Sequence, residues 1–269
     1  MKEINRKIQF VFANLNANSP QWFVVAGTDL TCELNKKYQS KMNKISSILL
    51  IGISLIGCQH LHSDEKVVFN QELADELAKM AEVDQIAAYI PQGTYKKMTT
   101  EQWNAFKDSV FTAHEKRLKQ IFDKHGFVGF DLAGEDGSES FWLMVQHSDN
   151  NPEFQEDVLG KMKIEVDKEN ADPGNYGLLV DRVMLNKGGK QVYGTQVTYN
   201  METGQAYAKS LEDSLNVNER RASIGLEPLE VYLNAMTERH FEMNKETYLK
   251  KGVTAPKLYE ITQNHYPQK

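Results

Sequence analysis

Cysteine is nearly absent from this chain, whose 269 residues include only Cys32 and Cys58. Residues 59–269 contain none, so that part of the chain cannot form disulfides, bind zinc through thiolates or use a Cys nucleophile. A surplus of basic charge is lacking too, because 31 Lys and Arg stand against 37 Asp and Glu. Nucleic-acid affinity depends largely on Lys and Arg at phosphates, so this composition argues against a nucleic-acid partner.

The acidic charge is concentrated in the larger, C-terminal part of the chain. Residues 58–269 hold 24 basic and 34 acidic residues, a net charge of −10, whereas the whole chain has −6. The chain is 41% hydrophobic and 25% charged, which are ordinary values for a globular protein. They exclude collagen-like, low-complexity and wholly disordered classes.

Hydrophobic runs long enough to cross a membrane are also missing. The mostly apolar segment Ile45–Gly57 would form a helix only about 20 Å long, against a hydrocarbon core of about 30 Å. It follows Lys44 and precedes Cys58, which is the arrangement of a signal peptide. Leu55-Ile56-Gly57-Cys58 resembles the lipobox of bacterial lipoproteins, in which the cysteine is lipidated and becomes the first residue of the mature protein.

This resemblance divides the N-terminal part of the chain. We expect a signal peptide at 42–57, then a lipidated Cys58 and a tether at 58–71. Because a signal peptide is recognised at an N-terminus, translation is expected to start at Met42, which leaves residues 1–41 as a mis-annotated extension. Two or more acyl chains hold a protein stably on a membrane. The expected location is the bacterial cell envelope, and Gln59 after the cysteine favours the outer membrane over the inner one.

Residues 72–269 are predicted to form a single, mainly α domain with a small β-hairpin late in the chain. Apolar residues at helical spacing begin at Leu73, and a capping box at Thr99 starts a second helix. A third helix is expected over about 138–149. The pairs Asn151-Pro152 and Asp172-Pro173 combine a capping side chain with Pro at the first helical position, so each starts a further helix.

The hydrophobic period then changes to that of a strand. Residues 191–199 alternate in polarity, and Thr203-Gly204 provides a turn into a second short strand that ends near Tyr207. Helical patterns return at 218–224, and Pro228 starts a C-terminal helix.

Several polar residues break the local pattern. Asp84 lies eleven residues after Leu73, about 20° away on a helical wheel, so it falls on the apolar stripe. Asp181-Arg182 interrupts an apolar helix, where charges need compensation. These and similar positions give the candidate catalytic or ligand-binding residues, which are Asp84, Gln146, His147, Asp149, Asp181, Arg182, Tyr193, Gln196 and Arg221.

The same residues fall in motifs that resemble a family of uncharacterised bacterial domains. The similarity covers about residues 72–235. Its motifs are Glu76–Gln85, Gly134–Gly137, Trp142–Asp149 with Pro152–Gln155, Asp181–Val183, Tyr193–Gln196, and Arg220-Arg221 with Gly225–Leu229. The family has no assigned activity, so the resemblance supports the domain boundary and the motifs but implies no reaction.

Two interpretations of the candidate residues remain open. In one they form a pocket, where His147 is the general acid or base, Arg182 and Arg221 hold an anionic group, and carboxylates orient the imidazole. His147 and Asp149 would then converge only if their helix ends near Ser148. In the other, which we prefer, the residues form a buried polar network that stabilises the fold.

The predicted function is therefore that of a membrane-anchored envelope lipoprotein, a binding or structural module for a protein or small-molecule partner. The alternative is an envelope hydrolase that uses His147 with nearby carboxylates, so whether the protein is an enzyme stays open. No cofactor is expected. No metal is expected either, because His147 has no second His three or four residues away.

Overall fold

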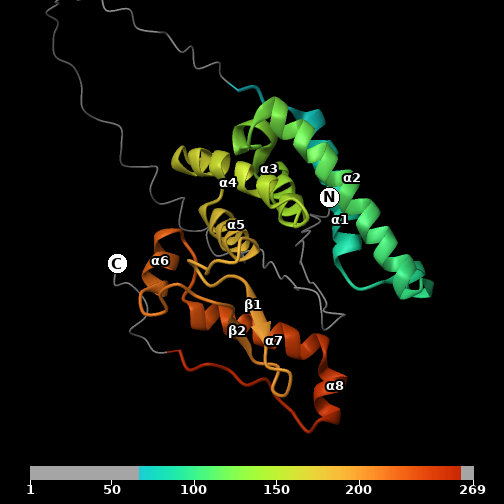
Figure 1. Cartoon of the computed structure of the whole chain (residues 1–269), viewed down its shortest axis with the longest axis vertical. Helices are drawn as coiled ribbons and strands as arrows, with labels where there is room; N and C mark the ends of the chain where they lie inside the picture. Colours follow the sequence, from blue (N-terminus) through green and yellow to red (C-terminus); the bar gives the residue numbers. More distant parts are fainter. Residues whose placement is uncertain (1–66, 262–269) are drawn as a thin grey trace, which may run out of the picture. The chain divides into compact units, whose positions relative to one another are not determined.

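The computed structural model describes residues 67–261 and confirms the mainly α fold with one late β-hairpin (Figure 1). The predictions on residues 1–41, the signal peptide and Cys58 lie outside this range. Within it, no helix combines the length and the apolar character needed to span a membrane. The elements are α1 (Gln71–Ala88), the 3₁₀ helix η2 (Gly93–Lys97), α2 (Thr100–His125), α3 (Phe130–Gln146), α4 (Pro152–Asp167), α5 (Pro173–Asn186), β1 (Val197–Tyr199), β2 (Ala206–Ala208), α6 (Val217–Ser223), α7 (Leu229–Met243) and α8 (Lys245–Lys250).

Side-chain caps set the helix starts as the sequence predicted. The hydroxyl of Thr99 accepts a hydrogen bond from the backbone of Gln102, whose side chain accepts one from the Thr99 backbone in return. Asn151 and Asp172 cap α4 and α5, and each is followed by Pro at the first helical position. The three predicted helix starts are thus confirmed. They could be predicted from sequence because capping depends on contacts within a few residues.

The predicted extent of α3 was wrong at both ends. The helix starts at Phe130, eight residues earlier than expected. It is interrupted at Gly134, whose φ of 73° is unfavourable for any residue that has a side chain. It ends at Gln146, because the next two amides bond to carbonyls three residues back: His147 to Met144 and Ser148 to Val145. Such tightening is usual in a final turn, and it releases the chain before Pro152 starts α4.

The core is built around the second half of α3. Phe141, Trp142, Leu143, Met144, Val145 and Gln146 are all 0–1% exposed. A helix buried on every side must be covered all round; α3 packs against α1 and α2 and also contacts α4 and α5 (Figure 1). Gly137 permits the break within α3, since a Cβ there would lie only 2.7 Å from the Cβ of Ala133, whereas its 3.7 Å distance from Ala74 of α1 is an ordinary contact.

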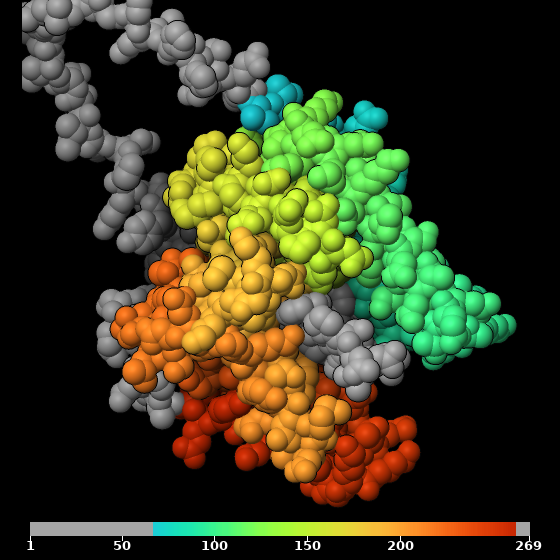
Figure 2. Space-filling model, viewed as in Figure 1, coloured from blue at the N-terminus to red at the C-terminus, as the bar shows by residue number. Residues whose placement is uncertain are grey.

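Helices α4 and α5 pack against each other, and their side chains meet at the surface in the space-filling view (Figure 2). The hairpin follows α5. Its strands are antiparallel, with Val197 opposite Ala208 and Tyr199 opposite Ala206, and α7 lies against β2. The ring of Tyr199 stacks on that of His240 in α7 with centroids 3.8 Å apart.

The first predicted strand is correct only in its last third. Residues 197–199 form β1, whereas 191–196 form a loop around the carboxylate of Asp181. This carboxylate accepts hydrogen bonds from the backbone amides of Val192, Tyr193 and Thr195 at 2.7–2.9 Å, and from the Thr195 hydroxyl at 2.9 Å. The amides converge on one side chain, so they are not available to a strand ladder.

Removing this carboxylate should destabilise the fold strongly. In Asp181→Ala the buried donors of the 192–195 loop lose their acceptor, so we expect a loss of about 3 kcal/mol or more in the free energy of unfolding. Urea denaturation measures it. Asp157→Ala, on the exposed side of α4, is the matched control and should change stability by less than about 0.5 kcal/mol. Equal losses in the two variants would contradict the anchoring role.

Candidate functional site

The carboxylate of Asp84 in α1 binds the imidazole of His147 directly after α3. Asp84 Oδ2 lies 2.7 Å from His147 Nδ1 and accepts a hydrogen bond from Gln85 Nε2 at 3.0 Å. Its other oxygen lies 3.7 Å from Nδ1 of His114 in α2. Asp84 is 0% exposed, so the sequence placed it correctly on the buried stripe.

The two imidazoles keep this buried carboxyl ionised. Burial alone would raise the pKa of Asp84, but the charges and hydrogen bonds of His147 and His114 outweigh it and hold the pKa below its usual range. The phenyl ring of Phe111 packs on the other side, with its centroid 5.2 Å from that of His147. An ionised carboxylate at Nδ1 fixes the orientation of the imidazole, as in the histidines of general acid–base sites.

Asp149 belongs to a second network, on α4 and α5. Its carboxylate pairs with Nη1 of Arg182 at 2.9 and 3.1 Å and accepts hydrogen bonds from Gln155 and Asn186 at 3.1 Å each. Arg182 Nη1 also donates to the carbonyl of Gln146. Thus α3 ends before Ser148, which was the condition for His147 and Asp149 to converge. They do not converge, because His147 bonds to Asp84 of α1 and Asp149 to Arg182 of α5.

The remaining candidates lie around the hairpin and have mainly structural partners. Arg221 donates to the carbonyls of Glu227 at 2.6 Å and Tyr193 at 2.8 Å, and its guanidinium lies 5.0 Å from the ring centroid of Tyr232. Gln196 exchanges two backbone bonds with the side chain of Gln191. Arg182 and Arg221, expected to hold one anionic group together, therefore sit in separate networks.

One group of buried polar atoms lacks partners. The indole Nε1 of Trp142 and both amide atoms of Gln146 make no hydrogen bond, although the two residues are 1% and 0% exposed. They lie four residues apart on α3, so they share a face of the helix. We call Trp142 and Gln146 the α3 site. The side-chain oxygen of Gln196 is buried and unpaired as well.

Helix α3 contacts α5 near the α3 site. Glu139 lies three residues before Trp142 on this face, and its pKa is raised by burial and by the charges of Asp136 and of Asp172, the residue that caps α5. Farther along α3, Arg182 of α5 donates to the Gln146 carbonyl.

Lys209 is next to this region and was not found from the sequence. It lies opposite Gln196 at the end of the hairpin, and its amide donates to the Gln196 carbonyl at 3.0 Å. Burial and the charge of Arg182 lower the pKa of its amine to about 8, and Asp149 opposes this shift. Nothing in the local sequence marks Lys209, because only the hairpin register brings it to α5.

Two other site residues could have been found from sequence. His114 lies eleven residues after the buried Trp103 and between the buried Val110 and Leu118, so the helical-wheel argument that located Asp84 applies to it. Trp142 stands in the apolar run of α3, where a buried indole N–H needs a partner.

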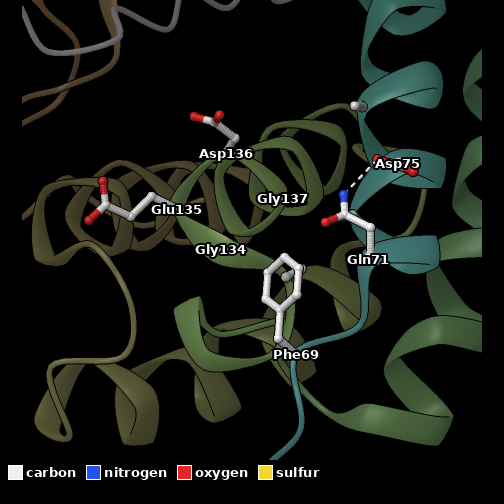
Figure 3. Close-up of a pocket in the computed structure, with 10 residues that line it drawn as sticks. Phe69, Gln71, Asp75, Gly134, Glu135, Asp136 and Gly137 are labelled. Atoms are coloured by element: carbon white, nitrogen blue, oxygen red, sulfur yellow. Dashed lines mark hydrogen bonds between the residues drawn. The ribbon is translucent and has the colours of Figure 1, made fainter.

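The Gly134–Gly137 motif borders a groove elsewhere, between α1 and α3, with a volume of about 470 Å³. Figure 3 shows Phe69 next to Gly134, and Glu135 and Asp136 directed away from Gln71 and Asp75. Gln71 Nε2 donates to Asp75 at 2.9 Å, so these two side chains satisfy each other. The motif is explained by the helix break and the close packing, and the groove offers no chemistry.

Within residues 67–261, no three His, Cys, Asp or Glu side chains are grouped so that they could hold a metal ion. The region around the end of α3 combines an oriented imidazole, a buried ion-pair network and two buried side chains with unpaired polar atoms.

Comparison with known proteins gives a family but no activity. No curated protein and no solved structure matches the chain. The family of unknown function DUF6624 matches residues 71–244, which run from the first residue of α1 to the residue after α7. This confirms the resemblance seen in the motifs and extends it nine residues past the expected boundary. The chain belongs to the DUF6624 family.

Proposed function

We propose that this protein is a lipid-anchored envelope protein whose helical domain binds a polar small molecule at the α3 site. The observation that carries the binding role is the buried indole N–H of Trp142 and the whole amide of Gln146, three polar groups without a partner. A buried polar group left unpaired costs about 1–3 kcal/mol. A ligand that supplies the missing partners offsets this cost, and that is a source of affinity and specificity.

Other buried polar side chains of the domain find their hydrogen-bond partners within the protein, and this distinguishes them from the α3 site. Gln155, also 0% exposed, donates to the carbonyl of Val145 and to Asp149, and it accepts from Asn186. Asp181 and Arg221 are likewise bonded to backbone groups. Natural proteins pair nearly all such buried groups, so an unpaired pair of side chains on one helix face supports a ligand site.

Replacing Gln146 separates a binding role from a structural one. In Gln146→Leu the unpaired amide is removed at similar volume, so the free energy of unfolding should stay the same or rise. Thermal shift against a panel of polar small molecules should find compounds that stabilise the wild type and not the variant.

Gln155→Leu is the matched control, because its amide is equally buried but fully bonded. It should lose about 2–3 kcal/mol of stability. A comparable loss in Gln146→Leu would refute the binding role and show that Gln146 supports the fold.

The anchoring part of the proposal rests on the lipobox. Leu55–Cys58 follows a short apolar segment with a basic start, and a diacylated N-terminal cysteine holds a domain at the membrane. The acidic domain would then lie within the reach of a short tether, at the envelope face of the bilayer.

Metabolic labelling tests the anchor directly. In bacteria fed a clickable fatty acid, the wild-type chain should incorporate the label and sediment with membranes, and Cys58→Ser should lose both properties. Cys32→Ser is the control, because that residue precedes the predicted cleavage point, and it should behave as the wild type. Labelling that persists in Cys58→Ser would refute lipidation at this residue.

A hydrolase remains the second candidate, on one specific observation. The 2.7 Å contact between Asp84 and His147 Nδ1 fixes the orientation of the imidazole, as a carboxylate does for the histidine of general acid–base sites. In this role the neighbouring α3 site would hold the substrate.

The enzyme role predicts a clear kinetic effect. On the p-nitrophenyl ester or phosphate that the wild type turns over fastest, His147→Gln should reduce kcat/KM by about 10²–10⁴-fold, because the proton acceptor is lost. His125→Gln, at the end of α2, serves as the control. Wild-type turnover by His147→Gln would eliminate this candidate.

A further inference from the structure

The last part of the described chain differs in charge from the part before it. Residues 71–244, which the family model matches, hold 18 basic and 30 acidic residues, a net charge of −12. Residues 245–261 hold four lysines and two glutamates, a net charge of +2. We call residues 245–261 the C-terminal segment. A protein with its charges divided in this way is oriented by a charged surface, because one part is attracted and the other repelled.

The C-terminal segment is fixed to the hairpin and to α7. Residues 245–250 form α8, and the later part of the segment, in red in Figure 1, runs back along α7. The backbone of Tyr259 exchanges two hydrogen bonds with the side chain of Asn234 in α7, at 2.7 and 3.0 Å. The Tyr259 hydroxyl donates to the carbonyl of Ala206 in β2 at 2.7 Å. The segment therefore presents a defined surface.

Two lysines of the C-terminal segment are available to an anionic partner. Within residues 67–261, Lys250 and Lys257 are exposed and form no ion pair. The ammonium group of Lys245, in contrast, is bonded to the carboxylate of Glu242 at 3.0 Å. The uncompensated positive charge of this surface therefore lies at the end of α8 and in the stretch that follows it.

Large apolar side chains are exposed beside these lysines. Leu249 and Leu258, each next to one of them in the chain, are 47% and 43% exposed. Met201, in the turn of the hairpin, is 70% exposed and lies beside them, because Lys251 donates to its carbonyl at 3.1 Å. Lysines interleaved with exposed apolar side chains suit the interface of a bilayer, where apolar groups enter and ammonium groups meet phosphates.

We infer that the C-terminal segment binds an anionic phospholipid bilayer, with its lysines at the lipid phosphates and Leu249, Leu258 and Met201 in the interfacial region. This inference rests on the envelope location proposed above, which brings the domain to a bilayer. An anionic leaflet attracts lysines near its surface and repels the acidic remainder of the domain, so both effects turn the segment toward the lipid. The acidic surface of a second copy is the competing partner.

Spin-label EPR on the full chain tests the inference. With Cys32→Ser and Cys58→Ser, the substitution Leu249→Cys provides the only thiol, so a nitroxide there reports on this surface alone. The probes are vesicles of phosphatidylcholine and vesicles of an equal mixture with phosphatidylglycerol. On the mixed vesicles the label should be accessible to oxygen and shielded from a water-soluble nickel complex. On phosphatidylcholine alone it should stay in water.

Ile164→Cys in α4 is the matched control for the label, because this aliphatic side chain is also 47% exposed. Its label should stay in water on both kinds of vesicle. Salt at about 1 M, which screens charges beyond roughly 3 Å, should return the label at residue 249 to water.

The lysines should supply the affinity. Lys250→Gln together with Lys257→Gln should lower the ratio of immersed to aqueous label by about ten-fold or more, because two ammonium groups near the phosphates are lost. Lys116→Gln together with Lys161→Gln removes the same charge from exposed positions in α2 and α4, and should leave this ratio unchanged.

A label at residue 249 that stays in water on the mixed vesicles would overturn the inference, and so would equal effects of the two lysine pairs. A label shielded from both reagents would overturn it in favour of contact with a second copy. Equal immersion on the two kinds of vesicle would reject the anionic lipid. The chain used here lacks Cys58, so the lipid anchor fails separately, through the fatty-acid labelling described above.

Discussion

Two consecutive side chains of α5 hold this domain together. Asp181 accepts hydrogen bonds from the backbone amides of Val192, Tyr193 and Thr195, and Arg182 bonds to the last carbonyl of α3 and to Asp149. Neighbouring residues on a helix point about 100° apart, so one step along α5 reaches both the hairpin and the α3 end. Burying both charges is costly unless each is fully compensated. Their networks therefore fix where the hairpin and the core meet.

Two buried glutamines near the end of α3 differ in their hydrogen-bond partners. Gln146 and Gln155 are equally buried, but only the amide of Gln155 is fully bonded within the protein. Buried polar groups in a network stabilise a fold when all of them are satisfied, and a partly satisfied set needs another partner. Asp149, Asp181 and Arg221 have partners within the protein, whereas the indole N–H of Trp142 and the amide of Gln146 have none.

The Asp84–His147 pair lies where α3 ends, because His147 directly follows the last residue of this helix. It shares the Gln146–Asp149 segment with the ion pair of Arg182, yet it is held by α1 and α2. The imidazole of His147 is therefore held by the first two helices, while the carbonyl of the preceding residue, Gln146, is bonded to Arg182 of α5.

The sequence alone determined the features that depend on neighbours along the chain. Caps at Thr99, Asn151 and Asp172 start their helices because each side chain bonds to an amide two or three residues away. The helical period also put Asp84 on the buried stripe. Tertiary structure decided the rest: α3 starts eight residues before the predicted start and continues past a break at Gly134, and the segment before β1 leaves the strand because Asp181 accepts the amides of Val192, Tyr193 and Thr195.

The composition of the candidate site was decided in the same way. Lys209 comes to lie opposite Gln196 only through the hairpin register, and His147 and Asp149 point to different partners because Asp84 of α1 holds one and Arg182 of α5 the other. Contacts between distant segments depend on packing geometry, which no local pattern encodes.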